Sequence, residues 1–325
     1  MTMQIKTLDL EHTCGHVDAN SKVSSEWLAE KYINYFRDDQ GERLKKFIHK
    51  VFTDTGVTIG YHRAWFARVR AKLSIYGDAS DQYKRVYDYA SAILKYNPGS
   101  SALVSVTGAQ NPPPTFQRMY VCMEACKVGF TEGCRPLIGI DGCHLKGAYP
   151  GMILAAVAKD GNNNIFPVAW AVVEVEDKQS WRWFLELLIN DIGFHNGEGL
   201  TVMSDRQKGL IDAVETVCPK AEVRFCVRHI WANFKLQFSG TAFKESFWRA
   251  VRTSSRFTFI AEMAAIKFLS QDAYNYLAAI PPKYWARHAF LTRSKSNLLL
   301  NNLCETFNSV IKEARDKPII HALNG

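Results

Sequence analysis

Two apolar segments of the chain each end in an aspartate. Residues 135–142 deliver Asp141, with Gly142 expected to let the chain turn, and residues 200–205 repeat the pattern and end in Asp205. Short apolar runs bounded by turn residues are typical of buried strands. An acid at a strand end is usually a turn former. If the two strands are neighbours in a sheet, however, the two carboxylates form one acidic cluster.

Glu305 is the third candidate acid. It lies in a helix predicted over residues 301–315, whose apolar face we expect to comprise Leu303, Phe307, Val310, Ile311 and Ala314. At about 100° per residue, Glu305 lies about 200° from Phe307 and on the same side as Asn302. The simplest interpretation is a solvent-facing glutamate. If the helix packs beside the two strands, Glu305 completes a set of three carboxylates.

Three clustered carboxylates suit one kind of chemistry in particular. Phosphoryl transfer on nucleic acid by two metals requires acids that hold a pair of Mg²⁺ or Mn²⁺ ions about 3.5–4 Å apart. These ions prefer hard oxygen ligands and retain water in their coordination shell. The set Asp141, Asp205 and Glu305 meets that requirement.

The elements around the acids alternate between strands and helices. From residue 116 the pattern changes to strands, and from the Asp141 strand onward it predicts three strands, a helix, a strand, a helix, a strand and a helix, with a tight turn at 160–164 joining two strands as a hairpin. This order predicts a mixed α+β fold, a ribonuclease H-like core with a mixed sheet and helices on both faces. A Rossmann fold is disfavoured because no Gly-rich phosphate loop follows the first strand.

Helical periodicity dominates on either side of this core. We expect a helical N-terminal domain at 23–100, a connector at 101–129, the core at 130–239 and 297–325, and a helical insertion at 240–296. Within the N-terminal domain, residues 61–73 form a helix without acids that resembles the recognition element of a helix-turn-helix, although a solvated basic face is the alternative. Its candidate DNA-binding residues are Arg63, Arg68, Arg70 and Lys72.

Charge, apolar runs and cysteine usage restrict the class of protein. The net charge of +8 favours a polyanionic partner. No apolar run reaches the roughly 18 residues of a membrane span, and we expect no membrane association. Eight cysteines without a regular framework favour reduced thiols or metal ligation over disulfides. His12 and Cys14 have the spacing of half a zinc site.

The motifs around the acids resemble those of Mutator-like element transposases of the plant type, which have an Asp-Asp-Glu core. The matching segments are residues 139–147, 204–210, 226–229 and 301–309, in the order of the family. The resemblance implies that the three acids are catalytic and bind Mg²⁺ or Mn²⁺. It also implies cut-and-paste transposition, in which hydrolysis at the element ends precedes attack of a freed 3′-hydroxyl on target DNA.

The same resemblance implies partners and location. The implied partner is double-stranded DNA, both the terminal inverted repeats and the target, and the implied localisation is nuclear. No small-molecule substrate is implied, and homo-oligomerisation is left open. Residues 1–22 resemble the end of a zinc finger, which makes His12 and Cys14 zinc ligands in the full-length protein. Because family members usually carry a second zinc module after the core, we expect this chain to be a fragment.

Several residues next to the acids are candidates for accessory roles. Lys146 and Arg206 would pair with phosphate or offset the acids' charge, and Asn302 lies beside Glu305. Cys226 and His229 have the spacing of a zinc pair but need two further ligands; the alternatives are a role beside the acids, orienting substrate or a metal-bound water, and core packing.

The alternative to a transposase is a domesticated, transposase-derived DNA-binding regulator of transcription without catalytic activity. A cellular ribonuclease H-like nuclease is a third hypothesis. The sequence does not separate the first two, because the acids are intact in both interpretations.

Overall fold

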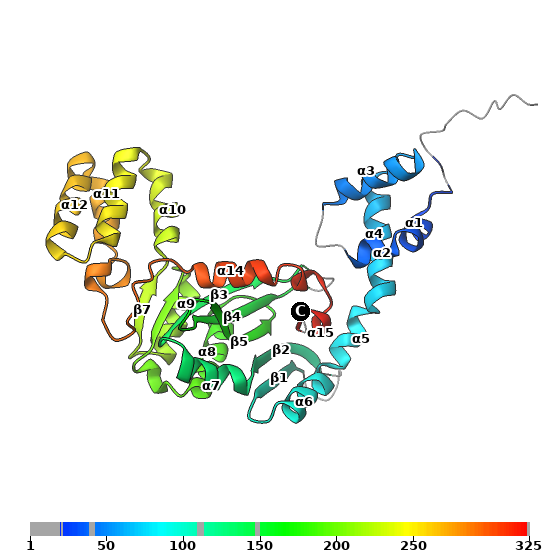
Figure 1. Ribbon diagram of the computed structural model, residues 1–325, viewed down its shortest axis with the longest axis horizontal. Coiled ribbons are helices and arrows are strands. Elements are labelled where there is room, and N and C mark those ends of the chain that lie inside the picture. The colour runs from blue at the N-terminus through cyan, green and yellow to red at the C-terminus, as the bar shows by residue number, and fades with distance from the viewer. Residues whose placement is uncertain (1–19, 21, 39–42, 109–113, 147–149, 324–325) are drawn as a thin grey trace, which may run out of the picture.

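A seven-stranded mixed sheet forms the centre of the molecule (Figure 1). The computed structural model describes residues 20, 22–38, 43–108, 114–146 and 150–323. The strand order is β1-β2-β5-β4-β3-β6-β7. The strands are β1 (Ser101–Thr107), β2 (Thr115–Cys122), β3 (Leu137–His144), β4 (Met152–Lys159), β5 (Ile165–Val173), β6 (Thr201–Ser204) and β7 (Glu222–Phe225).

The strand directions confirm the predicted mixed α+β fold, consistent with a ribonuclease H-like core. From β1 across to β3 all neighbours are antiparallel, and β4 and β5 form the predicted hairpin. The β3–β6 and β6–β7 pairs are parallel, because helices carry the chain back between these strands. The strands that carry the two aspartates are therefore neighbours, as the prediction required.

Three helices cover one face of the sheet: α7 (Glu124–Gly133), α8 (Lys178–Ile192) and α9 (Lys208–Val217). The face of α8 with Trp181, Phe184 and Leu188 is fully buried against alternate strand residues such as Ile138 and Ile140. Gly193 ends α8 in the left-handed conformation, with φ of 74°, which glycine adopts without strain. A short 3₁₀ helix, η1 (His195–Gly197), leads into β6.

The opposite face of the sheet is covered by α6 (Val86–Tyr96), α14 (Asn302–Val310) and α15 (Ile319–Leu323). Successive strand side chains alternate between faces, so the odd-numbered residues of β3 point to this side. Leu137 accordingly packs against Leu303 and Cys304 of α14. Asp141 therefore lies on the face that α14 covers.

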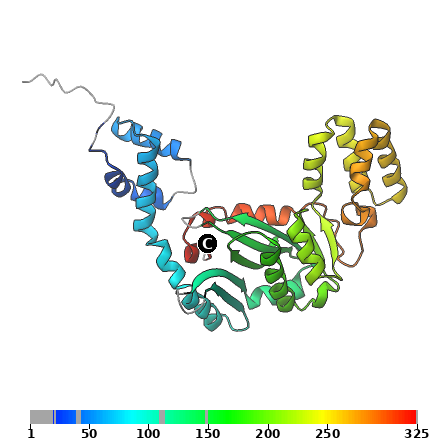
Figure 2. The same cartoon turned by 180° about the vertical axis from the view of Figure 1, so that it is seen from behind.

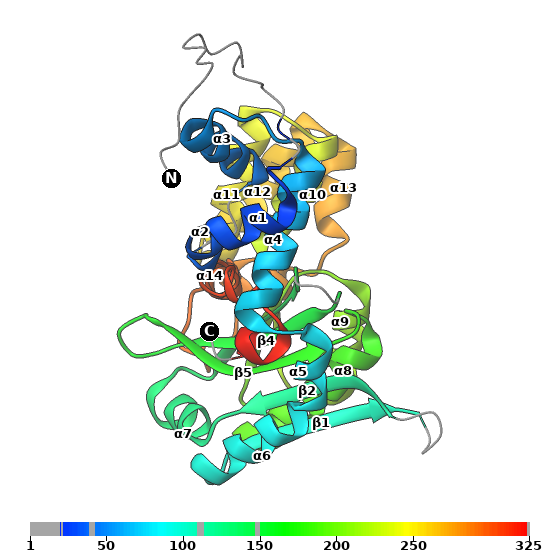
Figure 3. The same ribbon diagram turned by 90° about the vertical axis from the view of Figure 1, so that its right-hand side faces the viewer.

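Two helical bodies project from the core on the side where α14 lies (Figures 1 and 3). The N-terminal body consists of α1 (Ser25–Lys31), α2 (Ile33–Arg37), α3 (Leu44–Thr55) and α4 (Tyr61–Tyr76). The other comprises α10 (Val227–Gln237), α11 (Thr241–Arg252), α12 (Arg256–Leu269) and α13 (Gln271–Ala278), with η2 (Pro282–Tyr284) and η3 (Arg287–Ala289). Seen from behind, the two bodies remain on opposite sides of the core (Figure 2).

Some predicted boundaries differ from the structure. The segment 101–129, expected to be a connector, supplies β1, β2 and α7, and β2 bonds to β5 in the sheet. The predicted domain 23–100 divides at Gly77: residues before it share one core, whereas α6 packs on the sheet and α5 (Ala79–Lys84) links the two parts. The reason is that α6 buries its apolar face against β1 and β2, a contact that helical periodicity cannot indicate.

The insertion also differs from its predicted limits, because α10 packs with α11 to α13 in one apolar cluster. The last predicted helix is shorter than expected: α14 ends at Val310, which is 71% exposed rather than part of the apolar face, and η4 (Ala314–Asp316) follows. None of the helices in the described ranges is long and apolar enough to cross a membrane.

Candidate functional site

Asp141 lies within β3, not at its tip. The strand continues to His144, and Asp141 is opposite Ala155 of β4. The predicted turn at Gly142 is therefore wrong: Gly142 is a strand residue paired with Leu154. The Asn308 side-chain amide donates a hydrogen bond of 3.0 Å to Asp141 Oδ2 from α14. Because α14 crosses this face, the Asp141 carboxylate is only partly exposed.

Two other carboxylates lie near Asp141. Burial and, after it, the negative charges of Asp205 and Glu176 together raise the pKa of Asp141 to about 7. The Gly142 backbone N–H and the positive charge of His229 act in the opposite direction. Repulsion among acids is the expected result of grouping them in a partly dry site. The sheet therefore creates the acidic cluster that the sequence predicted from Asp141 and Asp205.

Asp205 follows β6 directly. Because β3 and β6 are parallel and Gly139 is paired with Met203, the end of β6 lies beside the Asp141 half of β3. Asp205 Oδ1 accepts a hydrogen bond of 3.1 Å from the Gln207 backbone N–H, which fixes the carboxylate at the entrance to α9. The two aspartates therefore come from adjacent strands of one sheet.

Glu176 is an acid that the sequence reasoning missed. It follows β5 by three residues, and its carboxylate lies against Gly142, where a Cβ would be 2.7 Å from the carboxyl carbon. The Trp181 indole N–H donates to Glu176 Oε1 over 3.2 Å. Burial and the charge of Asp205 raise the Glu176 pKa. A search for acids shortly after strands would have found it.

Glu305 is held by a different partner. It lies in the first turn of α14, and its carboxylate forms an ion pair with the Arg228 guanidinium at the start of α10. The helix itself is anchored over β3, since Asn301 Nδ2 donates to the Ile140 carbonyl over 3.0 Å and Asn308 binds Asp141. Glu305 therefore lies between two residues that contact β3. In the part of the chain that the structure describes, no three His, Cys, Asp or Glu residues are grouped to hold a metal ion.

The chemistry of the donor set nevertheless fits a hard cation. Asp141, Asp205 and Glu176 supply carboxylate oxygens whose mutual repulsion a divalent ion would relieve. The amide oxygens of Asn302, Asn308 and Gln207 are buried, and none has a hydrogen-bond partner among the described residues. Carboxylate and amide oxygens are ligands that Mg²⁺ and Mn²⁺ accept.

Cys226 and His229 lie next to the acids at the junction of β7 and α10. Burial opposes ionisation of the Cys226 thiol, but hydrogen bonds from His229 and from the Asn301 backbone lower its pKa overall. The hydrogen bond to Cys226, working against burial, raises the pKa of His229 to about 9. His229 therefore carries a positive charge at neutral pH, and this charge lowers the pKa of Asp141. These contacts favour the predicted role beside the acids.

The predicted DNA-binding residues are largely engaged within the chain. Arg70 pairs with Glu26 at 2.6 Å, Lys72 pairs with Asp316, and Arg63 donates to the Asn20 carbonyl at 3.4 Å. Arg68 also has a contact within the chain. These contacts leave α4 basic but reduce its free charge.

Lys146 and Arg206 are exposed, each close in sequence to one of the aspartates. His12 and Cys14 lie outside the described residues.

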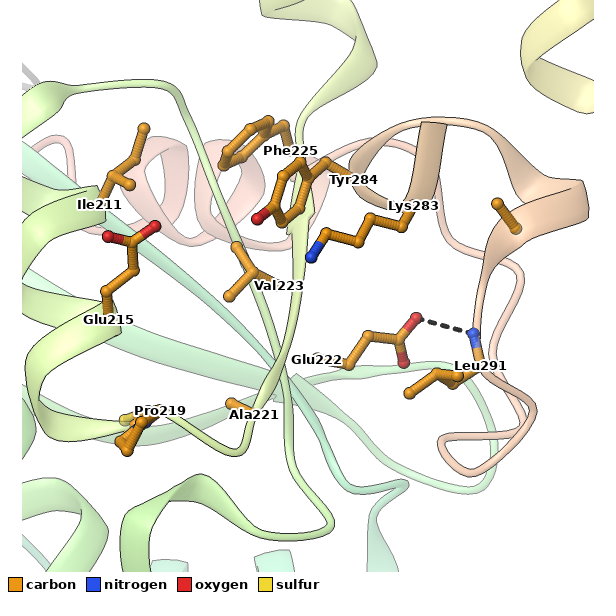
Figure 4. A pocket seen from close by; sticks show the side chains of 12 residues that line it. Ile211, Glu215, Pro219, Ala221, Glu222, Val223, Phe225, Lys283, Tyr284 and Leu291 are labelled. Atoms are coloured by element: carbon orange, nitrogen blue, oxygen red, sulfur yellow. Dashed lines mark hydrogen bonds between the residues drawn. The ribbon is translucent and has the colours of Figure 1, made fainter. Parts of the chain in front are cut away.

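A cavity of about 430 Å³ lies away from the acids, at the β7 edge of the sheet (Figure 4). Its wall includes the Tyr284 ring, stacked on Phe225 with centroids 4.8 Å apart, and the Glu222 carboxylate, which accepts from the Leu291 backbone N–H. Lys283 and Glu215 place charges of both signs along the same wall. The cavity contains none of the predicted site residues.

The fold and the site define the class of protein: an α+β chain, consistent with a ribonuclease H-like core, whose neighbouring central strands carry clustered acids. Residues 137–233, from the start of β3 into α10, match the family model of the MULE transposase domain. This match supports the resemblance to Mutator-like element transposases that the motifs indicated. The match includes Asp141, Asp205 and Glu176 and ends before Glu305. No curated protein matches the chain in a sequence search.

Proposed function

We propose that this chain is a DNA transposase that cuts and joins double-stranded DNA at a divalent-metal site formed by Asp141, Asp205 and Glu305. The observation that carries the proposal is the acidic cluster within the matched domain. Two aspartates from adjacent strands are so close that repulsion contributes to the raised pKa of Asp141. Such a cluster is unfavourable unless a cation or a proton neutralises it.

Each residue of the site has a definable task. Mg²⁺ or Mn²⁺ bound by the acids supplies a Lewis acid for phosphoryl transfer. Asn308 orients Asp141 from α14, and the Trp181 indole holds the Glu176 carboxylate against Gly142, near enough for its charge to raise the pKa of Asp141. His229, charged at neutral pH, offsets negative charge on a bound phosphate and has a proton to give to a leaving 3′-oxygen.

We propose further that DNA binding releases Glu305 into the site. Arg228, which now pairs with Glu305, has a side chain that is 51% exposed. A guanidinium binds phosphate in the same bidentate manner as carboxylate. When Arg228 contacts a DNA phosphate, Glu305 is freed one helical turn from Asn308, beside Asp141. Glu305 would then join Asp141 and Asp205 only in the complex with DNA.

The DNA path is proposed along the side of the core where α14 lies. The N-terminal body and the insertion both project there, and the chain carries a net charge of +8 (Figure 1). Arg63, Arg68, Arg70 and Lys72 of α4 are the proposed phosphate contacts, exchanging internal partners for DNA. Terminal repeats and target sites as substrates, nuclear residence and zinc at His12 and Cys14 belong to the same proposal.

One observation favours the alternative, a DNA-binding regulator without catalysis. Glu305 is occupied by Arg228, and the described residues do not present a ready three-acid metal site. If that pair persists on DNA, the fold would serve as a scaffold that binds without cutting.

Cleavage assays on the full chain separate the two functions. In the first assay, supercoiled plasmid and a double-stranded end substrate are incubated with the protein and Mn²⁺ or Mg²⁺, and nicking is measured. In the second, DNA binding is measured by fluorescence anisotropy. We expect metal-dependent nicking that Asp141→Asn, Asp205→Asn and Glu305→Gln each abolish, with DNA affinity unchanged or increased. Glu313→Gln, which changes an exposed acid beyond the end of α14, is the matched control and should cut normally.

The opposite result supports the regulator. Salt-sensitive DNA binding without nicking in wild type, and with no change in the three acid variants, would refute the catalytic proposal. A chain that shows neither binding nor nicking would refute both functions.

A further inference from the structure

Helix α12 is apolar on two opposite faces. Phe259, Met263 and Ile266 are buried in the core of the insertion. On the other side, Phe257 is 83% exposed and Phe268 is 93% exposed. Burying a phenylalanine side chain contributes about 1.5–3 kcal/mol, so leaving two of them in water is costly unless another surface covers them.

The exposed residues form one continuous stripe. At about 100° per residue, five positions fall within an arc of about 100°, and none of them is charged. We define the α12 stripe as Phe257, Ile260, Ala261, Ala264 and Phe268. A surface for nucleic acid would need cations within the stripe, whereas this one suits a helix of similar apolar character.

Four of the five stripe residues are placed symmetrically about its centre, with Ile260 as the exception. The two phenylalanines stand at the ends, and Ala261 and Ala264 stand on either side of the midpoint. In an antiparallel pair of identical helices related by a twofold axis there, Ala261 faces the partner's Ala264 and Phe257 faces the partner's Phe268. Small residues where the axes cross permit close approach, and large residues at the ends fill the diverging space.

The position of α12 leaves this face accessible. Both views along the same axis place α12 at the outer end of the insertion, on the side away from the N-terminal body (Figures 1 and 2). Two of the charged residues beside the stripe have partners within the chain: Glu262 binds Arg249 at 2.8 Å, and the Lys267 ammonium lies 5.5 Å from the Tyr274 ring centroid. Arg256, next to Phe257 at the start of α12, is exposed and flanks one end of the stripe.

We propose that the α12 stripe is a self-association surface, covered by the same stripe of a second copy in antiparallel orientation. From Phe257 to Phe268 the stripe is about 16 Å long at about 1.5 Å per residue. One helix pair of that length buries less than the roughly 1,600 Å² of a standard stable interface. We therefore expect a weak dimer that forms only as the protein concentration rises.

Sedimentation velocity on the full chain from 1 to 200 µM tests the proposal. We expect a concentration-dependent shift from the 36.8 kDa monomer to a dimer. Phe268→Asp should raise the dissociation constant at least tenfold. Leu236→Asp, which changes an 81% exposed residue of the same insertion, is the matched control and should associate like wild type. A wild-type monomer at 200 µM would overturn the proposal.

A second control addresses another apolar helix face. On α4, Tyr61, Trp65, Val69 and Leu73 are also exposed, at four-residue spacing. If Leu73→Asp abolished association while Phe268→Asp did not, the interface would be on α4 and the proposal would be wrong.

Cross-linking tests the orientation independently of stability. Ala261→Cys and Ala264→Cys proteins are mixed and treated with a short thiol cross-linker, with wild type as the control for native thiols. An antiparallel pair should yield more linked dimer in the mixture than either variant yields alone. More linkage in the separate variants than in the mixture would contradict the antiparallel arrangement.

Discussion

Replacing Asp141 by asparagine should stabilise the metal-free protein, although Asp141 is a proposed catalytic residue. The variant keeps a side-chain oxygen to accept the hydrogen bond from Asn308 and removes a charge that faces Asp205 and Glu176. Asparagine is uncharged at every pH. The gain should therefore depend on pH in the way that the Asp141 carboxyl titrates.

The size of the expected gain in unfolding free energy follows from the pKa of Asp141. Its rise from the ordinary value of 3.8 to about 7, at about 1.4 kcal/mol per pH unit, corresponds to about 4 kcal/mol. Because the folded pKa is higher than the unfolded one, the folded chain binds the proton more tightly. The stability that this tighter proton binding contributes to the wild type is fully present below about pH 4 and is lost as the pH rises through about 7. Asp141→Asn should thus gain up to about 4 kcal/mol at pH 8 and about 2 kcal/mol at pH 5.

Urea unfolding in EDTA at pH 5 and pH 8 measures the gain, and carboxyl ¹³C NMR of the wild type reports the Asp141 pKa directly. Asp272→Asn, an exposed acid in the first turn of α13, is the control and should lose less than about 1 kcal/mol at both pH values. A gain below about 1 kcal/mol at pH 8, or an equal gain at both pH values, would refute the reasoning.

Three further predictions follow from the same structure. Mn²⁺ or Mg²⁺ should raise the melting temperature of wild type at pH 8 but not of Asp205→Asn, as measured by differential scanning fluorimetry; equal shifts would show that the ion binds elsewhere. Gly142→Ala should displace the Glu176 carboxylate and lower the Asp141 pKa with little change in unfolding free energy, and an unchanged pKa by NMR would contradict the contact. Arg224→Met should destabilise the protein by about 3–5 kcal/mol in urea unfolding, because the fully buried Arg224 pairs with Glu222 and donates to the Leu291 and Ser296 carbonyls. Arg182→Met removes an exposed ion pair and should cost less than about 1 kcal/mol.

The sequence by itself determined the order and type of the elements in the core. Apolar runs with strand character and the amphipathic α8 predict the β3 to α10 succession, and that succession is confirmed. Local patterns suffice here because each element buries one side, and burial imposes a period of two or 3.6 on the apolar residues. The same patterns identified Asp141 and Asp205 as acids on strands that prove to be neighbours.

Tertiary structure decided the contacts among those elements. Glycine after Asp141 is compatible with a turn, yet Gly142 continues the strand because it pairs with Leu154 of β4, and the Glu176 carboxylate lies where a Cβ would be. The strand character within residues 101–129 does not indicate that they belong to the core sheet, which is decided by bonding between β2 and β5. The partner of Glu305 was equally hidden, because Arg228 is 77 residues away along the chain. Such pairings depend on which segments meet in space, and no local periodicity records that.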